Sequence, residues 1–556
     1  MTAPSPLGRP GSWRVGLAGP TAQVTAGNVV SRATGLLRVL AIGGALGTTF
    51  LGNVYQTANL VSNLLFELLA AGMLSSVLVP PFVALLGTDS LRSDRRDPDR
   101  RADVERLAGA LLGMTLAVMA VVTVAGLVAR PWIMRALTVT VPDADIRQAE
   151  IRLGSFLLIF FIPQVLLYVV GAVATAVLHS TRRFAAAALA PVANNVIVIA
   201  TLGAFWAVTH GGGRGAGLQL DLGPKLLLAV GTTAGVVAMT AVPVLAARRA
   251  GLRLRPRWDP HHPGLKALGR AGLWGAAALA ASQVLLATTL VLANRVEGGV
   301  VAFQIAFTMF LFPHALLAHP VLTTLYPRLA ADAVERRWAA FAAALGKGAR
   351  TIVFWTAPAT ALLAVLGGPA LRLIRVGALD PDGARLVAGV LAAYAFGLTG
   401  YAGIHLLTRA SYAAGDLRTP AVVSLGVAVG GSVLMVAGVA AATGDGRVVA
   451  LGVAHSVAMV VGAVCLLALV RRRVGEPVPV AAGVARAGVG AAVAAGVAAA
   501  ARAVVEGALG ADSRLAAAVT LAVAGTAGGA AYLAAQRLLR APELVRTGLV
   551  PALDGS

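Results

Sequence analysis

Residues 24–47 read VTAGNVVSRATGLLRVLAIGGALG, an apolar stretch long enough to cross a bilayer that nevertheless contains Arg32 and Arg38. An ionised side chain at bilayer depth costs at least about 2.5–3.5 kcal/mol, so it usually faces a cavity or a partner. The stretch therefore predicts a membrane-spanning helix beside a positively charged cavity. A cavity of that charge indicates an anionic substrate, and a lipid that carries phosphate fits it.

The relative placement of the two arginines constrains that cavity. Six positions correspond to about 9 Å along an α-helix and about 120° around it, so the two side chains do not form one stripe. Both can border a single cavity if the cavity is wide or if the helix is distorted. Gly35 lies between them and permits a distortion.

The rest of the chain has the composition of a membrane protein. Of its 556 residues, 58% are hydrophobic and 13% are charged, whereas a soluble domain has about 25% charged residues. Because apolar runs recur to the end of the chain, we expect one all-α polytopic membrane unit. The formal net charge is +22 with only 5% aromatic residues, and basic loops that hold a membrane topology explain this charge better than nucleic-acid binding.

Apolar runs of membrane-spanning length recur regularly. A spanning helix needs about 20 predominantly apolar residues, and by that criterion the sequence contains about fourteen candidates. They are 24–47, 58–86, 105–129, 151–178, 185–209, 224–247, 271–295, 300–326, 342–367, 384–413, 419–442, 447–470, 480–505 and 515–536. An even number of spans places both termini on the same side of the membrane.

The basic residues cluster in alternate loops. Loops 87–104 and 248–270 and the run 471–473 are rich in arginine, whereas the loops on the other side are poor in it. Since lysine and arginine are enriched in cytoplasmic loops, both termini are predicted to be cytoplasmic. No secretory signal precedes the first span.

The chain is also predicted to divide into two halves at its longest arginine-rich connector. Transporters often contain repeated halves with the substrate site between them, although no strong internal sequence repeat is present here. The expected organisation is a cytoplasmic tail (1–20), an N-lobe of spans 1–6 (21–247), a basic cytoplasmic linker (248–270), a C-lobe of spans 7–12 (271–476), and spans 13–14 with a short cytoplasmic tail (477–556).

The second span carries polar residues of its own. Asn59, Asn63 and Glu67 follow one another at steps of four and so share one stripe on a regular helix. A carboxylate at Glu67 can pair with an arginine of the first span and lower the cost of both. The alternative is a purely structural polar network between neighbouring helices, but two arginines near a glutamate favour a site.

Motifs for other chemistry are missing from the sequence. Cys465 is the single cysteine, no metal-ligand spacing occurs, and no nucleotide-binding loop or nucleophile elbow is found. We therefore expect a transporter without a cofactor, not an enzyme, driven by the membrane potential or an ion gradient. His314 and His319 lie beside Pro313 and Pro320; polar packing at a helix kink is favoured there over a proton or ion role.

Four segments carry a family resemblance. The first is Ser31-Arg32-Ala-Thr-Gly35-Leu-Leu-Arg38. The others are Asn63-Leu64-Leu65 through Gly72-Met-Leu-Ser75 to Val79-Pro80; Arg183-Phe184 with Ala190-Pro191 and Asn195; and Arg409-Ala-Ser-Tyr412-Ala-Ala-Gly-Asp416-Leu-Arg-Thr419-Pro420. The first resembles the S-R-x-x-G-x-x-R opening of the MurJ/MviN family, the lipid II flippases of bacterial wall synthesis, and the others are similar to later segments of that family.

The resemblance implies a fold, a substrate and a set of site residues. The fold is that of the MOP exporter superfamily, with two lobes in a V around a cationic cavity and the last two spans forming a groove for a lipid tail. The implied substrate is lipid II, an undecaprenyl-diphosphate-linked disaccharide pentapeptide moved to the outer leaflet by alternating access. The candidate substrate-binding residues are Arg32, Arg38, Asn59, Asn63, Glu67, Asn195 and Arg409.

Three departures from the family pattern keep other functions open. Phe66 and Glu67 stand where many members have two arginines, Thr308 stands where many have another, and Asn53 replaces an acidic residue of the first outer loop. One alternative is an exporter of another polyprenyl-phosphate-linked saccharide; a drug-type cation is disfavoured by the arginines. Another is a transport-inactive scaffold that binds cell-wall synthesis or division proteins.

Overall fold

The computed structural model describes residues 18–71, 98–180, 183, 185–212, 217–252, 254–259, 271–375, 377–510 and 513–546. Within these ranges the regular elements are all helices, so the all-α prediction is confirmed. The first half contains α1 (Ala18–Leu46), α2 (Phe50–Leu65), the π-helix η1 (Phe66–Ala71), α4 (Pro98–Leu137), α5 (Ala144–Phe161), α6 (Gln164–Ser180), α7 (Ala185–Val208) and α9 (Leu222–Arg249).

The second half is longer and, in its described residues, also consists of helices. It contains α11 (Ala271–Ala293), α12 (Gly299–Pro313), the π-helix η3 (His314–Ala318), α13 (His319–Val334), α14 (Trp338–Ile374), α15 (Pro381–Ala395), α16 (Leu398–Ala413), α17 (Arg418–Ala441), α18 (Gly446–Val474), α19 (Ala481–Leu509), α20 (Arg514–Leu538) and α21 (Pro542–Arg546).

The helices match the expected membrane spans closely. Twelve described segments are long and apolar enough to cross a membrane, and the bent pair α15–α16 makes a thirteenth if it counts as one span. These correspond to every sequence-predicted span except the second. That span begins in α2 and η1, and its remainder, 72–86, lies outside the described residues, so the count of fourteen stays a prediction.

Three fully described spans depart from a regular α-helix, and each departure has a chemical cause. Pro163 separates α5 from α6, and Pro313 precedes the π-helix η3, because proline lacks the backbone N–H that continues a helix. The 45° bend between α15 and α16 occurs at Gly397, where a Cβ would lie 2.7 Å from Ser456 Oγ. The Ser456 hydroxyl donates to the Ala393 carbonyl oxygen at 2.6 Å. The bend leaves this carbonyl without its helical partner, and the hydroxyl takes that place.

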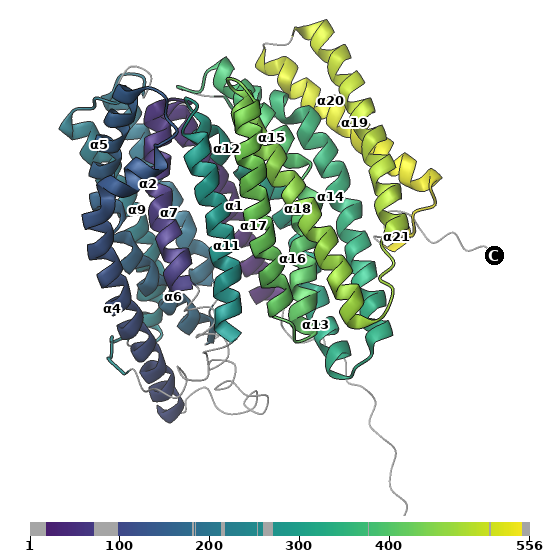
Figure 1. Cartoon of the computed structure of the whole chain (residues 1–556), viewed down its shortest axis with the longest axis horizontal. Helices are drawn as coiled ribbons and strands as arrows, with labels where there is room; N and C mark the ends of the chain where they lie inside the picture. The colour runs from purple at the N-terminus through teal and green to yellow at the C-terminus, as the bar shows by residue number, and fades with distance from the viewer. Residues whose placement is uncertain are drawn as a thin grey trace, which may run out of the picture.

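The helices pack as two groups (Figure 1). In the first, α7 packs between α1 and α9, and α5 covers α2. In the second, α14, α15, α16, α17 and α18 pack mainly on one another. The two groups meet where α12 contacts α1 and α2 and where α11 contacts η1 and α4. Helices α19 and α20 lie at the edge of the molecule against α14 (Figure 1).

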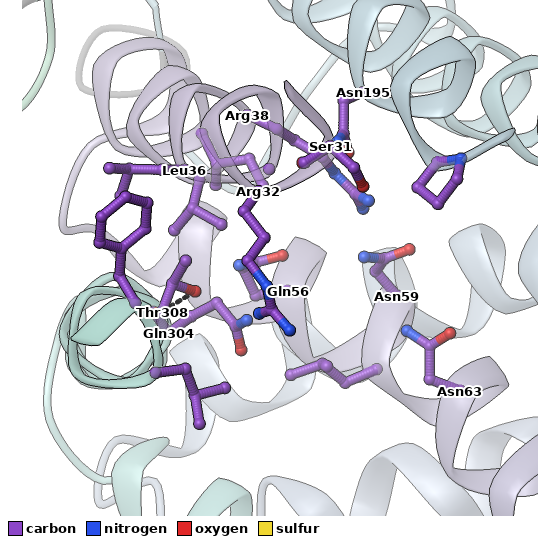
Figure 2. Close-up of a pocket in the computed structure, with 17 residues that line it drawn as sticks. Ser31, Arg32, Leu36, Arg38, Gln56, Asn59, Asn63, Asn195, Gln304 and Thr308 are labelled. Carbon is purple, nitrogen blue, oxygen red and sulfur yellow. Dashed lines mark hydrogen bonds between the residues drawn. The ribbon is translucent and has the colours of Figure 1, made fainter. Parts of the chain in front are cut away.

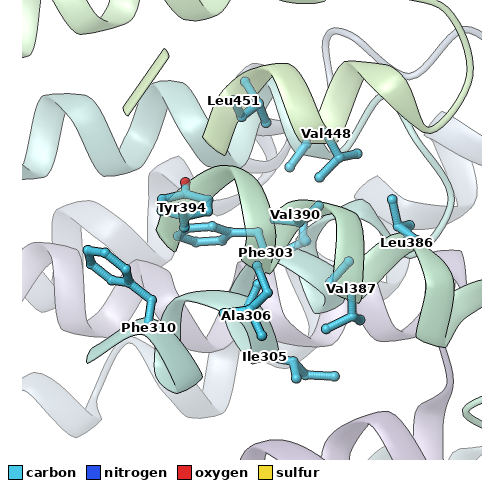
Figure 3. Packing of buried hydrophobic residues seen from close by; sticks show 14 of the residues in the cluster. Phe303, Ile305, Ala306, Phe310, Leu386, Val387, Val390, Tyr394, Val448 and Leu451 are labelled. Carbon is cyan, nitrogen blue, oxygen red and sulfur yellow. The ribbon is translucent and has the colours of Figure 1, made fainter. Parts of the chain in front are cut away.

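An aromatic cluster makes the second group rigid beside the first. Phe303 and Phe310 of α12 pack on Tyr394 of α15, with ring centroids 6.0 and 5.9 Å apart. Leu451 of α18 covers them (Figure 3). Buried aromatic rings contribute large apolar areas, so α12 is held firmly where it faces α1.

Ion pairs attach α19 and the short helix α21 to α14. Two acidic residues, each shared by two arginines, link α14, α19 and α21: Glu543 with Arg350 and Arg486, and Glu506 with Arg372 and Arg502. The Arg350–Glu543 pair is 3.1 Å long with both side chains largely buried. Removing one partner of such a pair leaves an uncompensated charge, which is strongly destabilising.

Candidate functional site: a cationic pocket between the two helix groups

A cavity of about 470 Å³ lies where α1, α2, α7 and α12 meet (Figure 2). Its lining consists of Ser31, Arg32, Gly35, Leu36, Arg38, Val39, Ile42, Gln56, Asn59, Leu60, Asn63, Pro191, Asn195, Gln304, Thr308, Leu311 and Phe312. This lining includes two arginines and no acidic residue, so the pocket carries net positive charge. We call it the cationic pocket.

Both arginines of the first span line the cationic pocket. Arg32 is exposed and Arg38 is half-buried. Neither forms an ion pair within the described ranges, and Arg38 Nε is buried without a hydrogen-bond partner. Since an unpaired guanidinium in a membrane protein is costly, the arrangement favours an anion that enters the pocket.

The cationic pocket is wide enough for both arginines to line it. Helix α1 runs without interruption from Ala18 to Leu46, so Gly35 does not break it. Of the two explanations that the sequence left open, a wide cavity and a distorted helix, the structure shows the first. Both side chains border one cavity because the cavity wraps around one side of α1. Figure 2 shows Arg32 extending from α1 toward the amides of Gln56 and Gln304.

Amide side chains form the wall opposite the arginines. Gln56, Asn59 and Asn63 lie on one stripe of α2 at steps of three and four, and all line the pocket. Gln56 was not singled out from the sequence, although its spacing from Asn59 is the signal that identifies it. Neutral amides can bind an anion through N–H donors without repelling the arginines.

The structure does not place Glu67 in the cationic pocket. Glu67 lies in the π-helix η1, forms no ion pair with Arg32 or Arg38 in the described part of the chain, and is absent from the lining. A π-turn changes the helical register, so the stripe of Asn59 and Asn63 does not continue to Glu67. The expected pairing of Glu67 with an arginine of the first span is wrong for this structure.

Asn195 lines the pocket and also holds α1 in place. Its Nδ2 donates to Thr34 Oγ1 at 3.1 Å and approaches the Ser31 carbonyl at 3.4 Å. The amide nitrogen is therefore engaged with the helix that carries the arginines. Asn195 positions α1 against α7, and only its carbonyl oxygen faces other partners.

Arg409 lies outside the cationic pocket, on α16. It is within electrostatic reach of His314, His319 and His405, and Arg32 acts on His314 and His319 as well. Arg409 therefore belongs to a second polar group on the wall of the C-terminal half that faces α1.

Hydrogen bonds between the two groups close one end of the pocket. Val300 N donates to Asn53 Oδ1 at 3.0 Å, and Asn53 Nδ2 donates to the Val296 carbonyl at 2.9 Å. Asn294 Nδ2 donates to Thr57 Oγ1 and to the Leu137 carbonyl, both at 3.1 Å. We call this side, where α1 ends and α2 begins, the closed end.

A second, larger cavity of about 670 Å³ lies at the closed end. Its lining includes five acidic residues and no basic one: Asp145, Glu297, Asp380, Asp382 and Asp445. A cavity of this charge repels anions. The smaller cationic pocket is therefore the candidate anion site, and no group of metal-binding side chains occurs in the ranges that the structure describes.

Comparison with known proteins identifies the family. The sequence profile of the lipid II flippase MurJ family matches residues 42–520. The chain belongs to the lipid II flippase MurJ family. The match begins after Arg32 and Arg38, so the similarity of that stretch rests on its motif. Membership and the many apolar helices make the chain a multi-pass bacterial membrane protein.

Individual relatives agree with the MurJ assignment. A probable lipid II flippase MurJ of Rhizobium meliloti is 28% identical over 394 residues, covering 70% of this chain and 69% of the relative. The lipid II flippase MurJ of Burkholderia cenocepacia is 26% identical over 410 residues, covering 72% and 74%.

Solved structures agree in fold. Lipid II flippase MurJ in an inward closed conformation matches with a TM-score of 0.70 at 16% identity, covering 95% of this chain and 100% of that one. An inward-facing multidrug resistance MATE transporter of the MOP superfamily matches at 0.62 and 14% identity, covering 82% and 98%. The expected MOP exporter fold is confirmed.

Proposed function

We propose that this chain is a flippase that moves lipid II, or a closely related polyprenyl-diphosphate-linked saccharide, from the inner to the outer leaflet. The observation that carries the proposal is a cavity between two helix groups lined by Arg32 and Arg38, neither of which forms an ion pair among the described residues. Family membership supports lipid II as the substrate. The chain then acts as a transporter and not as an enzyme.

The chemistry of the cationic pocket suits a diphosphate. A guanidinium offers charge-assisted and often bidentate hydrogen bonds to phosphate oxygens. The amides of Gln56, Asn59 and Gln304 can donate to further oxygens of the headgroup. The lipid tail stays in the bilayer while the headgroup crosses, so the protein needs to shelter only the polar part.

Alternating access follows from the hydrogen bonds at the closed end. Opening that end breaks the bonds that Asn53 and Asn294 make between the two groups. The acidic cavity beyond them repels a diphosphate and so favours its departure. The positive-inside pattern supports cytoplasmic termini, which makes the closed end the outer one.

The energy source and the protein partners complete the proposal. Since the sequence carries no nucleotide-binding motif, transport uses the membrane potential or an ion gradient. Cell-wall synthesis or division proteins are the partners expected from the family. Two positions that carry arginine in many family members are Phe66 and Thr308 here, so fewer arginines are available to the headgroup. Phe66 instead packs on Tyr168, with ring centroids 5.5 Å apart. This favours a related saccharide as the second candidate substrate.

Complementation tests the function. The wild-type chain and the variants Arg32→Ala and Arg38→Ala are expressed in a bacterium depleted of its own lipid II flippase, with membrane insertion checked by immunoblot. Rescue by wild type and not by either variant is expected. Rescue by both variants would remove the role of the arginines, and an inserted wild type that fails to rescue would favour another substrate or the scaffold function.

A further inference from the structure

Three aromatic side chains that the proposed function leaves unused form a cluster next to the cationic pocket. His314 of η3 packs on Tyr401 and His405 of α16, with ring centroids 4.9 and 5.3 Å away. Tyr401 and His405 are 4.6 Å apart. His314 follows Leu311 and Phe312, which line the cationic pocket. We call these three residues the histidine cluster.

The surroundings of the histidine cluster are basic. The electrostatic neighbours of His314 are His405, His319, Arg32 and Arg409, all of them cationic when charged. Arg32 also acts on Tyr401. Since Arg32 belongs to α1, the histidine cluster faces the same space between the two groups as the first-span arginines.

The other helices against η3 supply no carboxylate to this group. Those helices are α12, α13, α14 and α16. Helix α12 carries no charged residue. On α13, His319 adjoins η3, and the one carboxylate, Asp332, pairs with Arg328 and Arg337. On α14, Lys347 is exposed, while Arg350 and Arg372 pair with Glu543 and Glu506. No described acid therefore offsets the charge beside His314.

His314 also has unused hydrogen-bonding capacity. Its Nδ1 is buried and has no hydrogen-bond partner. A buried nitrogen without a partner costs free energy that a bound group can recover. A metal is not the group that fits, because no set of three metal-binding side chains occurs among the described residues.

We propose that the histidine cluster and Arg409 form the C-terminal half of the headgroup site, which binds an anionic phosphate group of the lipid-linked substrate together with a proton. The inference rests on the proposed function and adds a protonation step to it. Arg32 and Arg38 supply permanent charge from one side of the cavity. The imidazoles of His314 and His405 supply charge from the other side only when the substrate is present.

The physical basis is linkage between the proton and the anion. With the site empty, a proton on His314 adds a positive charge beside two guanidinium groups, which is unfavourable. A bound anion offsets those charges and favours the imidazolium. The proton comes from bulk water at binding and returns to it at release. By the same linkage, the anion binds more tightly as the pH falls through the range in which histidine titrates.

Binding measurements at two pH values test this protonation step. The probe is a short-chain polyprenyl-diphosphate disaccharide, a diphosphate diester whose own charge is constant across the range. Its affinity for the purified full chain in nanodiscs is measured at about pH 6 and about pH 8. Wild type is expected to bind about tenfold more tightly at the lower pH, with measurable proton uptake in weakly buffered solution.

Matched variants separate this inference from the proposed function. His314→Gln and His405→Gln should lose most of the pH dependence and keep the affinity seen at about pH 8. His210→Asn, in the exposed turn after α7, serves as the control and should behave as wild type. Arg32→Gln should weaken binding at both pH values.

Each other outcome has a defined meaning. A pH-independent wild type without proton uptake overturns the histidine inference, as does unchanged pH dependence in both His314→Gln and His405→Gln. If Arg32→Gln still weakens binding in those cases, the proposed function stands. If wild type binds the probe at neither pH, both the histidine inference and the proposed function are overturned. Equal competition by inorganic pyrophosphate would assign the site to free phosphate and overturn headgroup recognition.

Discussion

Asn53 of α2 caps the first turn of α12 from the opposite helix group, with Val300 N donating to Asn53 Oδ1 at 3.0 Å. Helix α12 has no capping side chain of its own, because its N-cap is Gly298 at φ +70°. A Cβ at Gly298 would also lie 2.4 Å from Thr48 Cβ. The N-terminus of α12 is therefore capped only when the two helix groups are closed against each other.

Asn53→Ala should open the closed end. Loss of an N-cap side chain costs about 1 kcal/mol, and here the cost falls only on the closed state. The distance distribution between spin labels at Ala149 and Asp382, on opposite sides of the acidic cavity, should gain a longer component in a Cys465→Ser background. Asn53→Asp keeps the acceptor for Val300 N, so its distance distribution should lie between those of wild type and Asn53→Ala. An unchanged distribution in Asn53→Ala would contradict the capping role.

Arg38→Gln should weaken binding of the diphosphate probe by about 10- to 100-fold, the value of one hydrogen bond to a charged group. Arg38→Lys keeps the charge and loses the bidentate geometry, so its loss should be smaller. Isothermal titration of the purified variants measures both. Equal affinities for wild type and Arg38→Gln would show that the substrate does not contact this guanidinium.

Gly397→Ala should destabilise the bend between α15 and α16. The added methyl group would lie 2.7 Å from Ser456 Oγ, and overpacking of this kind typically costs about 1–3 kcal/mol. Thermal unfolding in detergent should show a lower midpoint. Gly426→Ala is the control, because a Cβ there meets nothing within 4 Å. Equal midpoints for the two variants would mean that the bend adjusts without cost.

Asp416 should make stability depend on pH at the acidic end. Its burial acts to raise the pKa of the carboxyl, but hydrogen bonds from Thr419 and the Arg473 guanidinium outweigh burial and hold that pKa below its usual range. The stabilisation is therefore present above the unfolded pKa of about 4 and is lost as the pH falls through the lower folded value.

Thermal unfolding of Asp416→Asn checks this dependence. The variant should unfold at a lower temperature near neutral pH and show a smaller further loss on acidification than wild type. Asp445→Asn is the matched control, since Asp445 precedes α18 without a side-chain cap bond. The same acid profile in wild type and Asp416→Asn would exclude Asp416 as the source.

The sequence determined the helical spans and the charge of the site. Hydropathy is a local property, so thirteen of the predicted spans coincide with described helices or helix pairs. The cost of burying a guanidinium is local as well, which is why Arg32 and Arg38 predicted a cavity before any packing was known. The motif around them also indicated the family that the comparison establishes.

Tertiary structure decided which other residues share that site. The π-helix at Phe66 ends the polar stripe before Glu67, and Gln56 takes a place on the wall instead. The cap from Asn53 to Val300 joins residues that are 247 positions apart. Arg409 comes within electrostatic reach of His314 because α16 packs against η3. These placements depend on helix register and on packing between distant segments, whereas periodicity within one span reports only its own faces.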